Sequence, residues 1–182
     1  MSKAIGLVEY KTVSSGITAA DLMLKTSEVE VIQSEVVCPG KYFTLITGDL
    51  SAVRAAVDAA ADRFPGQLID SFVLGNPHES IFRAVWGTTS VKNPRALGIL
   101  ETYSVASAIV GADVAAKTAD VTLIELRLAR GMCGKSYLLL TGEVAAVSAA
   151  IEKAKAGAGE EGMFLDSSVI AGPDEKLWQT IL

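Results

Sequence analysis

The chain has 182 residues, of which half are hydrophobic and a fifth are charged, with a formal net charge of −5. This composition favours a folded chain with a sizeable core and disfavours a disordered one. The acidic balance and the absence of a basic run argue against a nucleic-acid partner. No apolar run approaches the ~20 residues that a membrane-spanning helix needs, so no membrane partner is expected.

The N-terminus and the cysteines indicate a compartment. The first ten residues, MSKAIGLVEY, lack the long apolar stretch of a secretory signal. Cys38 and Cys133 are the only cysteines in the sequence, and they do not form the pattern of a disulfide framework. We therefore expect a soluble cytoplasmic protein with reduced thiols.

The first half of the chain alternates strand and helix signals. β-branched or apolar runs predict the strands, and the helical spacing of Ile17, Ala20 and Leu24 predicts the first helix. Asp49 is placed to cap a second, alanine-rich helix. In chain order the pattern predicts strand 4–9, helix 15–28, strand 29–37, turn 38–41, strand 42–48, helix 49–64, strand 67–75 and a short helix 78–86.

The second half of the chain repeats this pattern of strands and helices. From Ala4, 12 of 29 positions are identical to the stretch that starts at Ala96. From Gly40, 10 of 21 positions match the stretch from Gly134, and from Asp70, 5 of 13 match the stretch from Asp166. Such self-similarity indicates a tandem duplication of nearly the whole chain.

The order β-α-β-β-α-β in each copy is the ferredoxin-like arrangement. It predicts an α+β fold of two tandem domains, each with an antiparallel sheet and helices on one face. We expect residues 1–90 to form the first domain and residues 91–182 the second. Residues 83–95, with breaks at Gly87 and Pro94, are the expected linker.

Four motifs occur in order in the first copy: A-x-G-x-x-E, AAD-x-M-x-K, GD-x-x-AV-x-AA and P-H. The second copy repeats the first of them and carries the other three in modified form, as GADVAAK, GEVAAVSAA and PD. Together they are similar to bacterial microcompartment shell domains. Two such domains in one chain resemble the tandem-domain, trimer-forming shell proteins. The CPGK turn narrows the resemblance to the iron–sulfur type of the propanediol-utilisation microcompartment, the T-subunit type.

The resemblance implies an assembly and a cofactor. Three chains make a pseudohexamer of six domains, in which the loops Cys38–Lys41 and Arg130–Lys135 face the central pore. Cys38 is implied to bind a [4Fe–4S] cluster on the three-fold axis, one per trimer, for electron transfer across the shell. The implied partners are two further copies of the chain, other microcompartment shell proteins, and an encapsulated or cytosolic redox enzyme.

A three-fold axis would explain how a single cysteine can serve a cluster, because it multiplies one thiolate into three. Pro39 stiffens the turn and Gly40 lets the backbone bend. The free N–H of Gly40 could point at the cluster sulfurs, and Lys41 could add positive charge or instead follow the next strand.

Other residues carry weaker signals. Cys133 aligns with Pro39 and is a spare thiol near the cluster, an alternative ligand or a small buried residue. His78, the single histidine, is expected to cap a helix. The resemblance places Lys25 and Lys117 on the edge where shell tiles meet, although the asparagine that usually follows is replaced by Glu28 and Asp120.

Two alternatives stay open. One is a shell trimer with an ordinary solute pore, in which Cys38 is a free thiol. The other is a ferredoxin-like small-ligand enzyme or regulator, which needs a pocket with convergent polar groups. The sequence has no Ser–His–Asp or Cys–His–Asp set, so we do not expect an enzyme.

Overall fold

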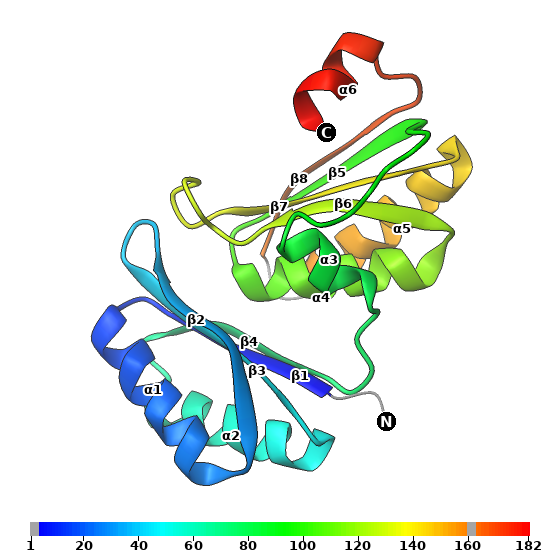
Figure 1. Cartoon of the computed structure of the whole chain (residues 1–182). Coiled ribbons are helices and arrows are strands. Elements are labelled where there is room, and N and C mark those ends of the chain that lie inside the picture. Colours follow the sequence, from blue (N-terminus) through cyan, green and yellow to red (C-terminus); the bar gives the residue numbers. More distant parts are fainter. Residues whose placement is uncertain (1–3, 160–162) are drawn as a thin grey trace. The chain divides into compact units, whose positions relative to one another are not determined.

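The computed structural model describes residues 4–159 and 163–182, which divide into two compact units (Figure 1). Unit 1 consists of Met1–Pro77 together with two short segments from later in the chain, Ser104–Ala106 and Ala129–Gly134. Unit 2 consists of His78–Tyr103, Ser107–Leu128 and Lys135–Leu182.

Unit 1 contains one four-stranded sheet in the order β2-β3-β1-β4, in which every neighbouring pair is antiparallel. Two helices lie on one face of this sheet (Figure 1). The predicted ferredoxin-like order is therefore confirmed. In chain order the elements are β1 (Ala4–Tyr10), α1 (Val13–Thr26), β2 (Val29–Val37), β3 (Lys41–Gly48), α2 (Leu50–Arg63) and β4 (Leu68–Leu74).

Unit 2 repeats this architecture with the sheet order β6-β7-β5-β8, again antiparallel throughout. The first residues of α4 belong to unit 1 and the rest to unit 2. The predicted α+β fold of two repeated domains is thus confirmed. The elements are α3 (Ser80–Val85), β5 (Ala96–Thr102), α4 (Val105–Thr118), β6 (Val121–Arg127), β7 (Ser136–Gly142), α5 (Val144–Gly159), β8 (Phe164–Ile170) and α6 (Glu175–Ile181).

The short helix α3 follows the first copy in the sequence but groups with unit 2, where it packs along β6. Its buried side chains are Ile81 and Ala84. The helix itself was predicted from the sequence, whereas its packing was not. The domain boundary at residues 90 and 91 stays a prediction.

The ends of the elements follow local capping chemistry. Thr12 is the N-cap of α1, and its Oγ1 accepts a hydrogen bond from the Ser15 backbone N–H at 3.4 Å. The helix therefore begins two residues before the predicted start at Ser15. Asp49 is the N-cap of α2, as predicted, although its side chain accepts no capping hydrogen bond from that helix.

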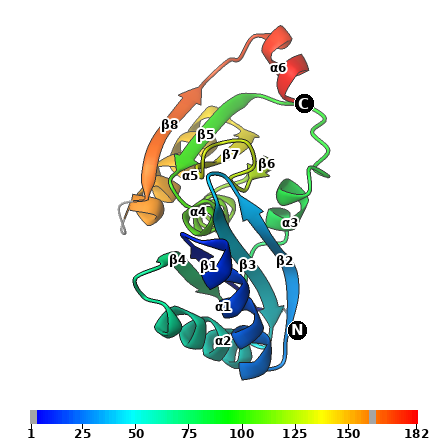
Figure 2. The same cartoon turned by 90° about the vertical axis from the view of Figure 1, so that its left-hand side faces the viewer.

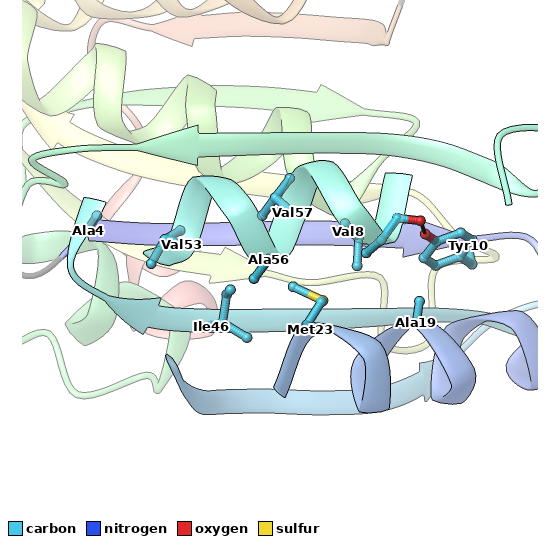
Figure 3. Packing of buried hydrophobic residues seen from close by; sticks show 10 residues of the cluster. Ala4, Val8, Tyr10, Ala19, Met23, Ile46, Val53, Ala56 and Val57 are labelled. Carbon is cyan, nitrogen blue, oxygen red and sulfur yellow. Dashed lines mark hydrogen bonds between the residues drawn. The ribbon is translucent and has the colours of Figure 1, made fainter. Parts of the chain in front are cut away.

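The core of unit 1 lies between the sheet and its two helices (Figure 3). Met23 of α1 and Ile46 of β3 are fully buried there. At one end of this core the Tyr10 hydroxyl donates a hydrogen bond to the Ala60 carbonyl of α2. Small side chains on the helices allow close packing on the sheet, and the buried ones include Ala19, Ala56 and Ala60. None of the helices within residues 4–159 and 163–182 combines the length and apolarity needed to span a bilayer.

Candidate functional site

Cys38 lies in the tight turn that joins β2 to β3, at the end of the hairpin seen in Figure 2. Its thiol is free and its side chain is exposed. The peptide bond between Cys38 and Pro39 is cis. Gly40 has a φ of 116°, a conformation that glycine adopts readily and other residues rarely adopt. The turn therefore presents a thiol at the surface on a defined backbone.

The turn corrects the prediction for the Gly40 N–H. This group donates a hydrogen bond to the Val37 carbonyl at 2.9 Å, which closes the turn. It is therefore not free to point at a bound group, because a tight hairpin uses its own backbone donors.

A second loop, residues 129–134, lies against the hairpin within unit 1. A Cβ atom added to Gly134 would lie 2.9 Å from the Cys38 carbonyl oxygen and 2.9 Å from Lys41 Cε. Gly134 also has a φ of 85°. Both the close approach and the backbone conformation require glycine here. The two loops that the sequence predicts at one site are thus in contact.

Lys41 is turned into the protein. Its Nζ donates to Glu9 Oε1 at 3.1 Å and to the Gly134 carbonyl at 3.0 Å. Two roles were predicted for Lys41: to add positive charge near the cluster, or to follow the next strand. Its contact with Glu9 shows that the ammonium group is paired within the protein. The ammonium group instead fixes the start of β3 to the second loop.

Glu9 is a buried carboxylate that the sequence analysis did not select as a site residue. Its Oε2 accepts the Val105 backbone N–H at 2.7 Å, while Oε1 accepts from Lys41. Burial raises the pKa of Glu9, although Lys41 and the Val105 N–H oppose that shift, and nearby Asp70 adds to it. The A-x-G-x-x-E motif contained this glutamate in both copies, which was the available signal.

Arg130 holds the outer part of the second loop. Its Nε and Nη2 donate to the two carboxylate oxygens of Glu35 on β2, at 3.0 and 2.7 Å. A bidentate pair of this kind fixes geometry, while its exposure limits its contribution to stability.

Cys133 is exposed and has a φ of 52°. Of the three interpretations of Cys133, the small buried residue is therefore wrong, while the spare thiol and the alternative ligand stay predictions. Across the described residues, no three His, Cys, Asp or Glu side chains form a group that could hold a metal ion. A metal centre at Cys38 would therefore need ligands from more than one copy of the chain.

His78 lies directly before Glu79, the N-cap of helix α3, and its side chain accepts a hydrogen bond from the first residue of that helix. Its Nδ1 accepts the Ser80 backbone N–H at 3.3 Å and lies 2.7 Å from the Ser80 hydroxyl. Its own backbone N–H donates to Asp113 Oδ1 at 2.8 Å. These contacts assign His78 a structural role in unit 2.

Lys25 and Lys117 occupy the last turns of α1 and α4. Each forms an ion pair with the aspartate four residues earlier, Asp21 at 2.5 Å and Asp113 at 2.6 Å. The role of both lysines in tiling stays a prediction.

Comparison with known proteins reveals the family. Residues 4–77 and 96–173 each match the BMC domain family. The chain is 39% identical over 182 residues to the bacterial microcompartment shell protein PduT of Citrobacter freundii, covering 100% of this chain and 99% of that protein. It is 36% identical over 81 residues to the shell protein PduA of the same species, covering 43% of this chain and 87% of PduA.

The fold comparison agrees. The crystal structure of a microcompartment protein from Desulfitobacterium hafniense matches with a TM-score of 0.84 and 42% identity, covering 98% of this chain and 99% of that one. Both halves of the chain match the family and the full length resembles PduT, so the resemblance predicted from the motifs is confirmed. The chain belongs to the BMC-domain family of bacterial microcompartment shell proteins and carries two such domains in tandem.

Proposed function

We propose that the chain is a structural shell protein whose trimer binds one [4Fe–4S] cluster through Cys38 of each of three chains. Six domains would then surround a central pore, and the cluster would sit where the three Cys38 turns meet. The observation that carries this proposal is the free, exposed thiol of Cys38 at the tip of a hairpin. The family match favours the shell role over the ligand-binding regulator.

The donor set fits a cluster only when copies of the chain combine. One chain offers Cys38 at this turn, with Cys133 in the adjacent loop as a second exposed thiol. A three-fold axis supplies three equivalent Cys38 thiolates, which matches the preference of such clusters for thiolate ligands. When bound, the cluster would accept and release single electrons, which is the chemistry needed to pass electrons across a shell.

The chain's own residues hold the turn in place. Lys41 joins the start of β3 to the Gly134 carbonyl and to buried Glu9. The Val37 carbonyl closes the turn through the Gly40 N–H. Because these contacts do not involve the Cys38 side chain, its thiol is available for a ligand outside the chain.

The test is anaerobic reconstitution with ferrous iron and sulfide, followed by an absorption spectrum and iron and sulfide analysis. Wild type should turn brown and contain ~4 iron and ~4 sulfide per trimer. Cys38→Ser should stay colourless. The variant should still have the molecular mass of a trimer in solution, because the Cys38 side chain is exposed and does not pack in the core.

Cys133→Ser is the matched control, since it removes the neighbouring exposed thiol. We expect this variant to retain the cluster, and loss of colour would instead make Cys133 a ligand. If reconstituted wild type is colourless, the cluster proposal fails and the trimer with an ordinary solute pore replaces it.

A further inference from the structure

Unit 1 carries two exposed thiols on neighbouring loops, and the proposed function uses one of them. Cys38 lies in the turn between β2 and β3, and Cys133 lies in residues 129–134, which belong to the same unit. Both thiols are free, and they are the only ones in the sequence. Within residues 4–159 and 163–182, neither side chain forms a hydrogen bond. The contacts of the fold therefore leave Cys133 without a role.

The backbones that carry the two thiols are close together. A Cβ atom added to Gly134, the residue after Cys133, would lie 2.9 Å from the Cys38 carbonyl oxygen. With standard bond lengths and ~3.8 Å between consecutive Cα atoms, the Cα atoms of Cys38 and Cys133 lie within about 11 Å of each other. A disulfide needs Cα atoms no more than roughly 7 Å apart. A shift of the second loop by at most about 4 Å therefore brings the pair within bonding range.

The second loop is held at its ends and open between them. Arg130 and Gly134 are fixed by the contacts with the first sheet described above. Between them, the Met132 N–H donates to the Ala129 carbonyl at 3.4 Å, which is long for a backbone hydrogen bond. A Cβ atom on Gly131 would meet nothing within 4 Å. The middle of the loop, which carries the thiol, can therefore move while its ends stay in place.

We propose that Cys133 is the resolving thiol of Cys38, and that the two oxidise to an intrachain disulfide when Cys38 holds no iron. Redox-sensitive cysteines are solvent-accessible and often lie next to a second, resolving cysteine, and this pair has both features. The consequence of the bond rests on the proposed function, because the disulfide and the cluster need the same Cys38 sulfur. The bond itself needs only one chain.

The oxidant is a low-molecular-weight disulfide such as oxidised glutathione. The Cys38 thiolate attacks one glutathione sulfur, the S–S bond of glutathione breaks, and one glutathione leaves as its thiolate. The Cys133 thiolate then attacks the Cys38 sulfur of this mixed disulfide, and the second glutathione leaves. The protons of the two cysteine thiols go to the two departing thiolates. The cysteine pair thereby loses two electrons, and oxidised glutathione gains two.

The disulfide makes cluster binding at Cys38 depend on redox state. Iron–sulfur clusters are held by thiolates, and a sulfur atom in a disulfide is not a thiolate. Oxidation therefore prevents the Cys38 turns from holding a cluster, and a reducing dithiol restores the thiols. In the opposite direction, a Cys38 sulfur bound to iron does not attack an oxidant, so the loaded trimer should resist this oxidation.

The test treats the iron-free, full-length chain with oxidised glutathione, blocks remaining thiols with iodoacetamide and measures the intact mass. Wild type should become lighter by two hydrogen atoms, retain no glutathione and take up no iodoacetamide. Proteolysis without a reductant should give one cross-linked product that contains Cys38 and Cys133. Dithiothreitol should return both thiols.

Cys38→Ser and Cys133→Ser are the matched variants, because each removes one partner and leaves the other. A mixed disulfide in either variant has no second thiol in the chain to resolve it. Each variant should therefore retain one glutathione, whereas wild type retains none. Both side chains are exposed, so neither substitution should disturb the fold, which circular dichroism verifies.

Wild type that retains glutathione, or that stays unmodified, would overturn the inference. Chains linked to one another on non-reducing electrophoresis would also overturn it, because that pattern shows disulfides between copies. The cluster and the disulfide fail separately. Colourless protein that forms the intrachain bond rejects the cluster alone, and brown wild type whose iron-free form keeps its glutathione rejects the disulfide alone.

Discussion

At the scale of single residues, Glu9 combines a buried position with a charge. Burial raises its pKa above the ordinary value of 4.5, while the Lys41 ammonium and the Val105 N–H favour the ionised form. The net shift is upward, which means that burial has the larger effect. The folded chain therefore binds a proton at Glu9 more tightly than the unfolded chain does.

This upward shift predicts how stability changes with pH. A raised pKa contributes stability that is fully present below pH 4.5 and is lost as pH rises through the pKa of the folded state. Glu9→Gln cannot titrate, so the free energy of unfolding of wild type minus that of the variant should decrease as pH rises above 4.5. Denaturant unfolding at several pH values measures the difference.

The protein concentration must be the same in all these measurements, because association itself stabilises the folded chain. If the difference grows as pH rises, the ion pair with Lys41 outweighs burial, and folding lowers the pKa of Glu9 instead of raising it.

At the scale of elements, the two copies carry different residues at the positions where the first helix of the domain meets the sheet. A Cβ atom on Gly16 of α1 would lie 2.5 Å from Tyr42 Cβ on β3. The aligned positions in the second copy are Ala108 and Ser136, which are a larger helix residue and a smaller strand residue. The two differences in size compensate each other in the sequence.

This compensation predicts the behaviour of Gly16→Ala. Alanine would favour the helix by about 1 kcal/mol, but overpacking against a side-chain atom that cannot move costs about 1–3 kcal/mol. We expect Gly16→Ala to destabilise the chain, and Gly16→Ala with Tyr42→Ser, the pair present in the second copy, to recover stability relative to the sum of the single changes. A double-mutant cycle by denaturant unfolding should give a favourable coupling of at least about 1 kcal/mol.

Ala108→Gly is the control, because it creates no overlap. It should cost about 1 kcal/mol through helix propensity and about 0.8 kcal/mol through loss of the buried Ala108 methyl group. Additive effects in the Gly16–Tyr42 cycle would show that α1 shifts to accommodate the added methyl group.

The elements themselves could be predicted from the sequence because their signals are local. Strand 29–37 was predicted with its observed bounds, and helix 15–28 differs from α1 by two residues at each end. The hydrophobic period and the turn residues are sufficient for such segments. The position of Cys38 in an exposed turn was predictable for the same reason.

The contacts around that turn could not be predicted. Glu9 with Val105, and Lys41 with Gly134, join residues more than ninety positions apart, and no local pattern records such a pairing. The Gly40 N–H was predicted to be free, whereas it donates a hydrogen bond to the Val37 carbonyl. That hydrogen bond depends on the detailed geometry of the turn, which the sequence does not specify. The packing of α3 on β6 is likewise a tertiary choice.

At the scale of the whole molecule, the two predicted edge lysines differ in their surroundings. The side chain of Lys25 is 72% exposed, and the side chain of its partner Asp21 is 59% exposed. Lys117 pairs with Asp113, which is 6% exposed and also accepts the His78 N–H. The first lysine is therefore available for contacts between tiles, whereas the second also stabilises a buried carboxylate in unit 2.

This difference predicts separable effects of two alanine substitutions. Lys25→Ala should leave the melting temperature nearly unchanged, because an exposed ion pair contributes about 0–1 kcal/mol, but it should reduce sheet formation if this edge tiles. Lys117→Ala should reduce sheet formation and also lower stability by about 1–3 kcal/mol, because it leaves the Asp113 carboxylate buried with one partner fewer. Thermal unfolding and electron microscopy of sheets, formed alone or with a single-domain shell protein, separate the two effects.

Normal sheets from Lys25→Ala would show that this lysine takes no part in tiling. An unchanged melting temperature for Lys117→Ala would show that Asp113 does not need its ion pair.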